Sequence, residues 1–256
     1  MIYETHAHYD DDAYSEDIEE VLKANEAAGI ARIVNVAASM EGCKTSIALA
    51  DKYPHIYASV GVHPSETMEL TSDDMNLIKQ YAAHEKVVAI GEIGLDYHDE
   101  DVPKEVQQKW FISQLDIARE VNLPLIIHSR DAAADTLNII KEQKAADMGG
   151  VIHCFSYGVE MAREYLNMGF YLGIGGVVTF KNGKKLKEVV EYAPIESLVT
   201  ETDSPYLAPT PYRGTRNTSA NIPIVIEEIA RIKEMEIAQV EEILWNNALR
   251  MYRQQA

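Results

Sequence analysis

Six side chains that can bind a metal ion stand where predicted β-strands end. Glu92 is the clearest of them, because it follows the apolar run 87–91 and lies between two glycines. A carboxylate at the end of a buried strand needs a positive partner, since burying the charge alone is very costly. Imidazoles and carboxylates are ligands of Zn²⁺, Mn²⁺ and related divalent ions. The sequence therefore predicts a metal centre formed by His6, His8, Glu92, His128, His153 and Asp203.

The histidine pair near the N-terminus predicts the site of a first ion. His6 and His8 are two residues apart, so both side chains of an extended strand point to the same side and can chelate one ion. Asp203 follows the last predicted strand and could bind the same ion. It could also take a proton from the water that the ion activates, which makes it the candidate general base.

Glu92 is the natural bridge to a second ion. One carboxylate can hold two ions about 3.5–4 Å apart, and His128 and His153 would complete the second of them. We therefore expect one or two divalent ions and a catalytic role for Glu92 beside that of Asp203. The mixed ligand set suits Mg²⁺, Mn²⁺, Zn²⁺ and Ni²⁺ alike. A single histidine at a strand end is more often structural, but five at strand ends are hard to explain in that way.

The elements that must position these ligands alternate along the whole chain. Strands are expected over residues 2–5, 32–37, 56–61, 87–91, 123–127, 150–152, 170–174 and 197–200. Helices are expected over 16–28, 41–53, 72–84, 103–121, 131–145, 158–168, 183–192, 219–234 and 238–253. Short apolar strands that alternate with helices pair in parallel through crossovers.

Eight such units in 256 residues predict an α/β fold, a (β/α)8 TIM barrel. We expect a single domain over 1–256 with one extra C-terminal helix, and a doubly wound open sheet is the alternative. In a parallel barrel the carboxyl ends of all strands open on one face, where active sites lie. Ligands far apart in sequence would therefore meet there.

Composition narrows the class of protein. The formal charge of −18 should repel polyanions at long range, which counts against a non-specific nucleic-acid coat protein. It does not exclude an enzyme whose metal ions supply local positive charge. The two cysteines lie far apart, the N-terminus lacks signal-peptide features, and no apolar run reaches the roughly 18 residues of a membrane span. We expect a cytoplasmic protein with no membrane association and no stable protein partner.

Basic and aromatic residues near the ligands are candidates for substrate binding. His63 ends the third strand and either contacts substrate or only packs. Arg130 and Arg213 follow ligands closely and could hold a phosphate. Four lysines after the seventh strand could do the same or form a solvated helix face: Lys181, Lys184, Lys185 and Lys187. Three loop tyrosines could stack on bases or merely pack: Tyr157, Tyr206 and Tyr212.

Several other polar residues have structural interpretations. We expect the run Asp10–Asp12 to be a solvated turn and Cys154 to point away from the site as a small buried residue. Asp96 is a candidate for orienting a ligating histidine. Glu201 is expected either to cap the following loop or to enter the site.

Six segments in this order resemble the TatD family of metal-dependent deoxyribonucleases, in the amidohydrolase superfamily. The segments are Thr5–His8, Gly61–Pro64, Gly91–Tyr97, His128–Ala132, His153–Ser156 and Glu201–Pro209, and the resemblance runs from Tyr3 to Tyr252. It differs from the usual family pattern in two places. Glu4 stands where the family often has Asp, and Tyr157 precedes Gly158 in a loop that commonly reads His-Cys-Phe-Ser-Gly.

The resemblance implies a (β/α)8 barrel and a centre of one or two metals. By motif position it assigns His6, His8, Glu92 and Asp203 to one ion and Glu92, His128 and His153 to the other. It further implies hydrolysis of DNA phosphodiesters, often exonucleolytic, with a metal-activated water as nucleophile. The alternatives are a hydrolase of a small amide, lactone or phosphoester on the same site, and a metal protein that has lost catalysis. A complete ligand set argues against the last.

Overall fold

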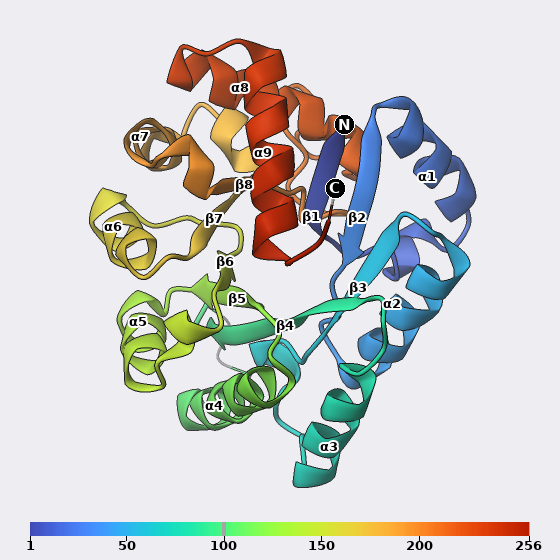
Figure 1. Ribbon diagram of the computed structural model, residues 1–256, viewed down its shortest axis with the longest axis vertical. Coiled ribbons are helices and arrows are strands. Elements are labelled where there is room, and N and C mark those ends of the chain that lie inside the picture. The colour runs from blue at the N-terminus through green and yellow to red at the C-terminus, as the bar shows by residue number, and fades with distance from the viewer. Residues whose placement is uncertain (99–100, 256) are drawn as a thin grey trace.

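The computed structural model describes residues 1–98 and 101–255. Within them, eight strands form one parallel sheet in the order of the sequence, as Figure 1 shows. Their bounds are β1 Ile2–Ala7, β2 Ile30–Asn35, β3 Ile56–Val60, β4 Val87–Asp96, β5 Leu125–Arg130, β6 Gly150–Ile152, β7 Tyr171–Ile174 and β8 Leu198–Thr200. The arrangement is the predicted (β/α)8 barrel.

A helix follows each strand and packs on the outside of the barrel (Figure 1). The helices are α1 Ile18–Ala27, α2 Met40–Lys52, α3 Ser72–Tyr81, α4 Lys104–Val121, α5 Ala133–Glu142, α6 Val159–Asn167, α7 Lys184–Tyr192 and α8 Ile222–Lys233. Local sequence fixes several of their ends. Thr71 and Asp74 form a capping box at the start of α3, and Asn122 ends α4 in the left-handed conformation.

The barrel closes between β1 and β8 through a short polar contact. An isolated bridge joins Ala7 to Ser204, and the backbone amides of His8 and Asp203 donate to the carbonyls of Ser204 and His6. Behind this seam the buried Glu4 carboxylate accepts hydrogen bonds from the backbone of His6 and Thr202 and from the hydroxyls of Thr202 and Ser219. Glu4 therefore links β1 to the segments that follow β8.

The predicted extra helix, α9 Ile237–Met251, covers the amino end of the barrel. Figure 1 shows it across the centre of the strands, with both chain termini close by. Its buried residues Trp245, Leu249 and Met251 pack in one cluster with side chains of the strands, including Tyr3 and Val199. A second, larger cluster lies between the strands and the surrounding helices. This end of the barrel is thus filled by apolar packing, which leaves the other end for polar side chains.

Three ligands lie inside strands instead of after them, so the predicted strand ends were wrong for β1, β4 and β5. His6 belongs to β1, Glu92 to β4 and His128 to β5. The reason is visible in the pairing of β4 with β5. After an irregularity between Ile90 and Ile93, the two strands stay paired as far as Asp96 and Arg130. These strands are longer than their apolar runs because backbone pairing continues through the polar residues.

The described residues contain no helix that is both long and apolar enough to cross a membrane.

Candidate metal centre

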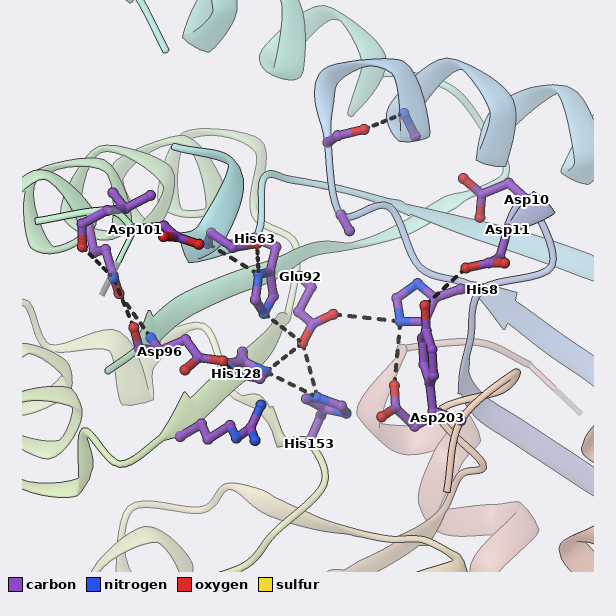
Figure 2. Close-up of a pocket in the computed structure, with 18 residues that line it drawn as sticks. His8, Asp10, Asp11, His63, Glu92, Asp96, Asp101, His128, His153 and Asp203 are labelled. Atoms are coloured by element: carbon purple, nitrogen blue, oxygen red, sulfur yellow. Dashed lines mark hydrogen bonds and ion pairs between the residues drawn. The ribbon is translucent and has the colours of Figure 1, made fainter. Parts of the chain in front are cut away.

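The six predicted ligands converge at the carboxyl end of the barrel, beside a cavity of about 590 Å³. Figure 2 shows Glu92 with His8 on one side and His128 and His153 on the other. The Glu92 side chain is buried, and its two carboxylate oxygens face different groups of ligands. We call these groups the β1/β8 half and the β5/β6 half of the centre.

The β1/β8 half consists of His6, His8 and Asp203 together with Oε2 of Glu92. The Nε2 atoms of the two histidines are 3.1 Å apart. From Glu92 Oε2 the distances are 3.4 Å to His6 Nε2 and 3.7 Å to His8 Nε2. Asp203 Oδ1 lies 3.7 Å from His6 Nε2 and 3.5 Å from His8 Nε2. Ligand atoms about 2.0–2.1 Å from a tetrahedral ion would be separated by roughly 3.4 Å, so the four donors fit one ion.

The β5/β6 half consists of His128 and His153 together with Oε1 of Glu92. This oxygen lies 2.8 Å from His128 Nδ1 and 2.9 Å from His153 Nε2. The two nitrogens are 3.4 Å apart. Three donors around one point leave room for further ligands, as in a catalytic site.

Hydrogen bonds behind His8 and His128 fix which nitrogen of each ring faces the centre. His8 Nδ1 is 2.8 Å from the carbonyl oxygen of Val36, which can only accept, so Nδ1 carries the proton and Nε2 presents a lone pair. His128 Nε2 lies 2.9 Å from Oδ2 of Asp96, which leaves Nδ1 as the ligand atom. The interpretation of Asp96 as an orienting residue agrees with this contact.

Behind His153 lies a carboxylate that the sequence left open. Glu201 is buried, accepts a hydrogen bond from the backbone amide of Cys154, and has Oε1 3.5 Å from His153 Nδ1. Gly173 makes room for it, because a Cβ atom there would lie 2.2 Å from Glu201 Oε2. Glu201 therefore faces β6 and β7 from inside the barrel, and it does not cap the loop after β8.

The electrostatics of the centre call for a cation. Burial raises the pKa of Glu92, but His153 and His6 outweigh it and hold the pKa well below its usual range. Burial lowers the pKa of His8, yet the contact with Asp203 and the charge of Glu92 raise it to about 9. Without a metal, protons on the histidines must balance the carboxylates. The tautomers of His8 and His128 direct imidazole lone pairs at buried carboxylates. Two electron-rich groups repel each other, so this arrangement suits a divalent ion between them.

His63 faces the centre as a hydrogen-bond donor. Its Nδ1 accepts from the backbone amide of Ser65 at 3.2 Å, so in the neutral ring the proton sits on Nε2. Nε2 lies 3.9 Å from Glu92 Oε1, on the cavity side. Burial lowers the pKa of His63 to about 4, which keeps the ring neutral. In this tautomer Nε2 suits a substrate oxygen better than it suits a metal ion.

The two predicted arginines lie in different places. Arg130 ends β5 and lines the cavity with His128 and Asp203. Arg213 lies farther out on the loop after β8, where its guanidinium stacks on Phe180 with 4.3 Å between Cζ and the ring centroid. It is not among the described residues that line the cavity. Arg130 thus shares the cavity with the candidate metal ligands, and Arg213 does not.

Other candidates also differ from their sequence interpretations. Asp10 and Asp11 line the cavity, so they are not simply part of a solvated turn. Cys154 is only partly buried and lines a neighbouring cavity. Tyr157 donates or accepts a hydrogen bond with Ser129 at 2.9 Å, which is packing behind β5. Sequence reasoning missed the carbonyl of Val36 and the backbone amide of Ser65, since neither residue type signals a metal site.

Comparison with known proteins agrees with this geometry. Residues 3–253 match the family described as TatD related DNase. An uncharacterized metal-dependent hydrolase of Bacillus subtilis, YabD, is 45% identical over 253 residues, 99% of each chain. The Escherichia coli protein YcfH, also an uncharacterized metal-dependent hydrolase, is 37% identical and covers 98% of this chain and 96% of its own.

A solved structure adds the three-dimensional comparison. The TatD homologue YJJV of Escherichia coli superposes with a TM-score of 0.94 at 28% identity, covering 99% of this chain and 98% of that one. The match therefore extends over the whole barrel and includes the strands that carry the ligands. The chain belongs to the TatD family of metal-dependent hydrolases.

Proposed function

We propose that this protein is a divalent-metal-dependent deoxyribonuclease that hydrolyses phosphodiester bonds from a chain end. The observation that carries the proposal is the shared Glu92, whose two oxygens face two separate sets of nitrogen donors. Two ions held by one carboxylate form the arrangement that many phosphodiesterases use to clamp the attacking and leaving oxygens. The family description, TatD related DNase, supports DNA as the substrate class.

When bound, the metal lowers the pKa of a water toward neutrality and polarises a phosphoryl oxygen. Asp203 is placed to take the proton, because its side chain is 20% exposed and the other ligands are 15% exposed or less. The backbone at Asp203 has a positive φ of 58°, and its amide donates to the carbonyl of His6. This turn holds the carboxylate over the β1/β8 half while leaving it open to solvent.

Two further groups are placed to bind the phosphate. Arg130 brings a permanent positive charge to the cavity wall, and His63 presents an Nε2–H. Both can donate to the non-bridging oxygens, whose charge rises as the water oxygen bonds to phosphorus and the ester oxygen departs. The ester oxygen leaves as an alkoxide and takes up a proton, so the products are a phosphomonoester and an alcohol.

The test uses purified protein with Mg²⁺, Mn²⁺, Zn²⁺ or Ni²⁺ and end-labelled single- and double-stranded DNA. We expect cleavage that EDTA abolishes and that Asp203→Asn lowers by about 10²–10⁴-fold in kcat, since this change removes the base. Asp147→Asn, a matched change at an exposed residue of the barrel exterior, should leave the rate unchanged. Cleavage by the Asp203→Asn variant at the original rate would remove Asp203 from the mechanism.

A second candidate function has one observation in its favour. Four carboxylates besides the metal ligands line the main cavity, namely Asp10, Asp11, Asp96 and Asp101, and they disfavour a polyanion. A small amide, lactone or phosphoester would meet less repulsion there. A panel of such compounds, assayed beside DNA with the same metal, separates the two functions by the ratio of their kcat/KM values.

A further inference from the structure

Two cavities that differ in their carboxylates meet at the candidate metal ligands. The main cavity carries the four non-ligand carboxylates Asp10, Asp11, Asp96 and Asp101. The second, of about 430 Å³, has no carboxylate except Asp203 among the described residues that line it. Its walls contain Arg130, Ser156, Val177, Tyr206 and Leu207. Arg130 and Tyr206 line both cavities, so the two routes to the centre differ in their carboxylates: the main route is acidic and the second is not.

The second route continues outward along a ledge built by two segments. One is the turn Gly176–Thr179 after β7, and the other is the loop after β8. They are in close contact, because a Cβ on Gly176 would lie 2.2 Å from the carbonyl oxygen of Leu207. Farther out, the amide of Thr210 donates to the Thr179 hydroxyl at 2.8 Å, and Arg213 stacks on Phe180. We call residues 176–181 and 206–213 the β7/β8 ledge.

Unpaired cations follow this route. Arg130 stands at its inner end, and Lys181 and Arg213 stand at its outer end, all three exposed. Across the described ranges 1–98 and 101–255, none of the three makes an ion pair or a side-chain hydrogen bond. The neighbouring cations differ, since Lys187 pairs with Glu228 and Arg216 with Asp17. Three cations without a partner among the described residues, in a chain of net charge −18, point to an anionic partner.

Exposed flat side chains accompany the charges. Tyr206 and Tyr212 have 56% and 50% of their surface exposed, although tyrosine usually packs at least one face. Tyr206 lines both cavities, and its hydroxyl donates to Asp11 at 3.0 Å, so it marks where the acidic route and the ledge part. Alternating cations and exposed aromatic rings are what single-stranded nucleic acid requires, since the rings stack on bases and the cations follow the backbone.

We propose that a single-stranded polynucleotide runs from the metal centre outward along the β7/β8 ledge, with its backbone at Arg130, Arg213 and Lys181. The acidic cavity then accepts only the terminal unit, because its carboxylates repel a continuing phosphate chain. This inference rests on the proposed nuclease function and names the path and form of its substrate.

The decisive variant is Lys181→Glu combined with Arg213→Glu. Its control is Lys23→Glu with Lys144→Glu, two exposed lysines on α1 and on the turn after α5. Both pairs change the net charge from −18 to −22, by −2 at each position, so long-range repulsion is matched. We expect the ledge variant to lose at least tenfold in kcat/KM for a 12-nucleotide single strand, and the control less than threefold.

The same two variants are assayed on bis(p-nitrophenyl) phosphate, which is too short to reach the ledge. Its hydrolysis should be equal in both within about twofold, which shows that the metal centre is intact. The affinity of the ledge variant for the oligonucleotide should also depend less on salt. The slope of log K against the logarithm of the salt concentration should become shallower by about 1.4, because each of the two lost phosphate contacts contributes roughly 0.7. Equal losses for ledge and control variants would overturn the proposal.

Stacking is tested by Tyr212→Ser against Tyr192→Ser, an exposed tyrosine of α7 on the barrel exterior. We expect three- to tenfold weaker binding for the first change only. Binding is followed by fluorescence anisotropy of a labelled 12-nucleotide strand without added metal, so it does not depend on hydrolysis. If the protein binds the strand through the ledge but does not hydrolyse it, the nuclease function is refuted and the path is retained. If the protein hydrolyses the strand and the ledge variants have no effect, the path is refuted and the nuclease function is retained.

Discussion

The two halves of the metal centre are positioned by different parts of the fold. The β1/β8 half lies at the seam of the barrel, where an isolated bridge and a few hydrogen bonds replace a strand ladder. The β5/β6 half lies where β5 pairs with β4 on one side and with β6 on the other. His8 is oriented by a neutral carbonyl at Val36, whereas His128 is oriented by the carboxylate of Asp96.

This difference suggests a division of labour. A ligand backed by a carboxylate is a stronger base and is held more rigidly, so the β5/β6 half should bind its ion the more firmly. The seam half contains Asp203, the most exposed of the candidate ligands, so it places the proton acceptor at the edge of the centre that solvent reaches. Glu92 is common to both halves, and the predictions that follow test how far they depend on it and differ from each other.

The largest effect should come from Glu92→Ala, which removes one ligand from each half. We expect both ions to be lost at micromolar metal and activity to fall by on the order of a thousandfold or more. Metal content after gel filtration, measured by mass spectrometry, checks this directly. A matched change at the exposed Glu227 should retain the metal. Two ions bound as in the unmodified protein would show that Glu92 is no bridge.

The two halves should also differ in their response to pH. The pKa of His8 without metal is about 9, above the ordinary 6.5, so at neutral pH an ion in the β1/β8 half must displace a proton. Affinity there should fall about tenfold for each unit below pH 9 and level off above it. Calorimetric titration in buffers of different ionisation enthalpy measures the released proton. An affinity that is equal at pH 7 and pH 9 would contradict the assignment.

A change behind one histidine should separate the halves. Asp96→Asn keeps the shape of the side chain but removes the charge that faces His128 Nε2. We expect the affinity of the β5/β6 half for metal to drop by about 10–100-fold while the β1/β8 half is unaffected. Titration with Mn²⁺ followed by electron paramagnetic resonance resolves the two binding steps. Equal weakening of both steps would mean that the halves are not independent.

The smallest effect should come from Gly173→Ala. The added methyl group would meet the Glu201 carboxylate, which must then shift away from His153. We expect a loss of about 1–3 kcal/mol in the free energy of unfolding, with activity reduced only a few-fold. Urea denaturation of the metal-free protein gives the first number. Gly175→Ala is the control, because its Cβ would meet only ordinary contacts at 3.5 Å or more.

Local patterns allowed much of the fold to be predicted. The eight apolar runs, the helices between them and α9 were all found, because strand and helix periodicities are properties of short segments. Strand ends were less well predicted. Val87–Gly91 reads as a complete strand, yet β4 continues to Asp96 because β5 supplies partners beyond the apolar part. A sequence does not show how long a neighbouring strand remains within reach.

Site residues divide in the same way. Histidine, aspartate and glutamate at strand ends signal metal chemistry by their type, and the structure brings all six predicted ligands together. Arg213 has the right type but stacks on Phe180 outside the cavity. A glutamate such as Glu201 could cap a loop or enter the site, and the sequence does not distinguish the two. Only the space over Gly173 shows that its side chain lies inside the barrel.

The sequence alone determined the fold class, the family and the set of candidate ligands, since these depend on residue types and on their order along the chain. The tertiary structure decided which oxygen of Glu92 faces which histidines and which nitrogen of His128 points inward. It also decided that two cavities, one with four further carboxylates and one without them, meet at the centre. These are distances and directions between strands far apart in sequence. They follow from the way the barrel closes, which no single segment encodes.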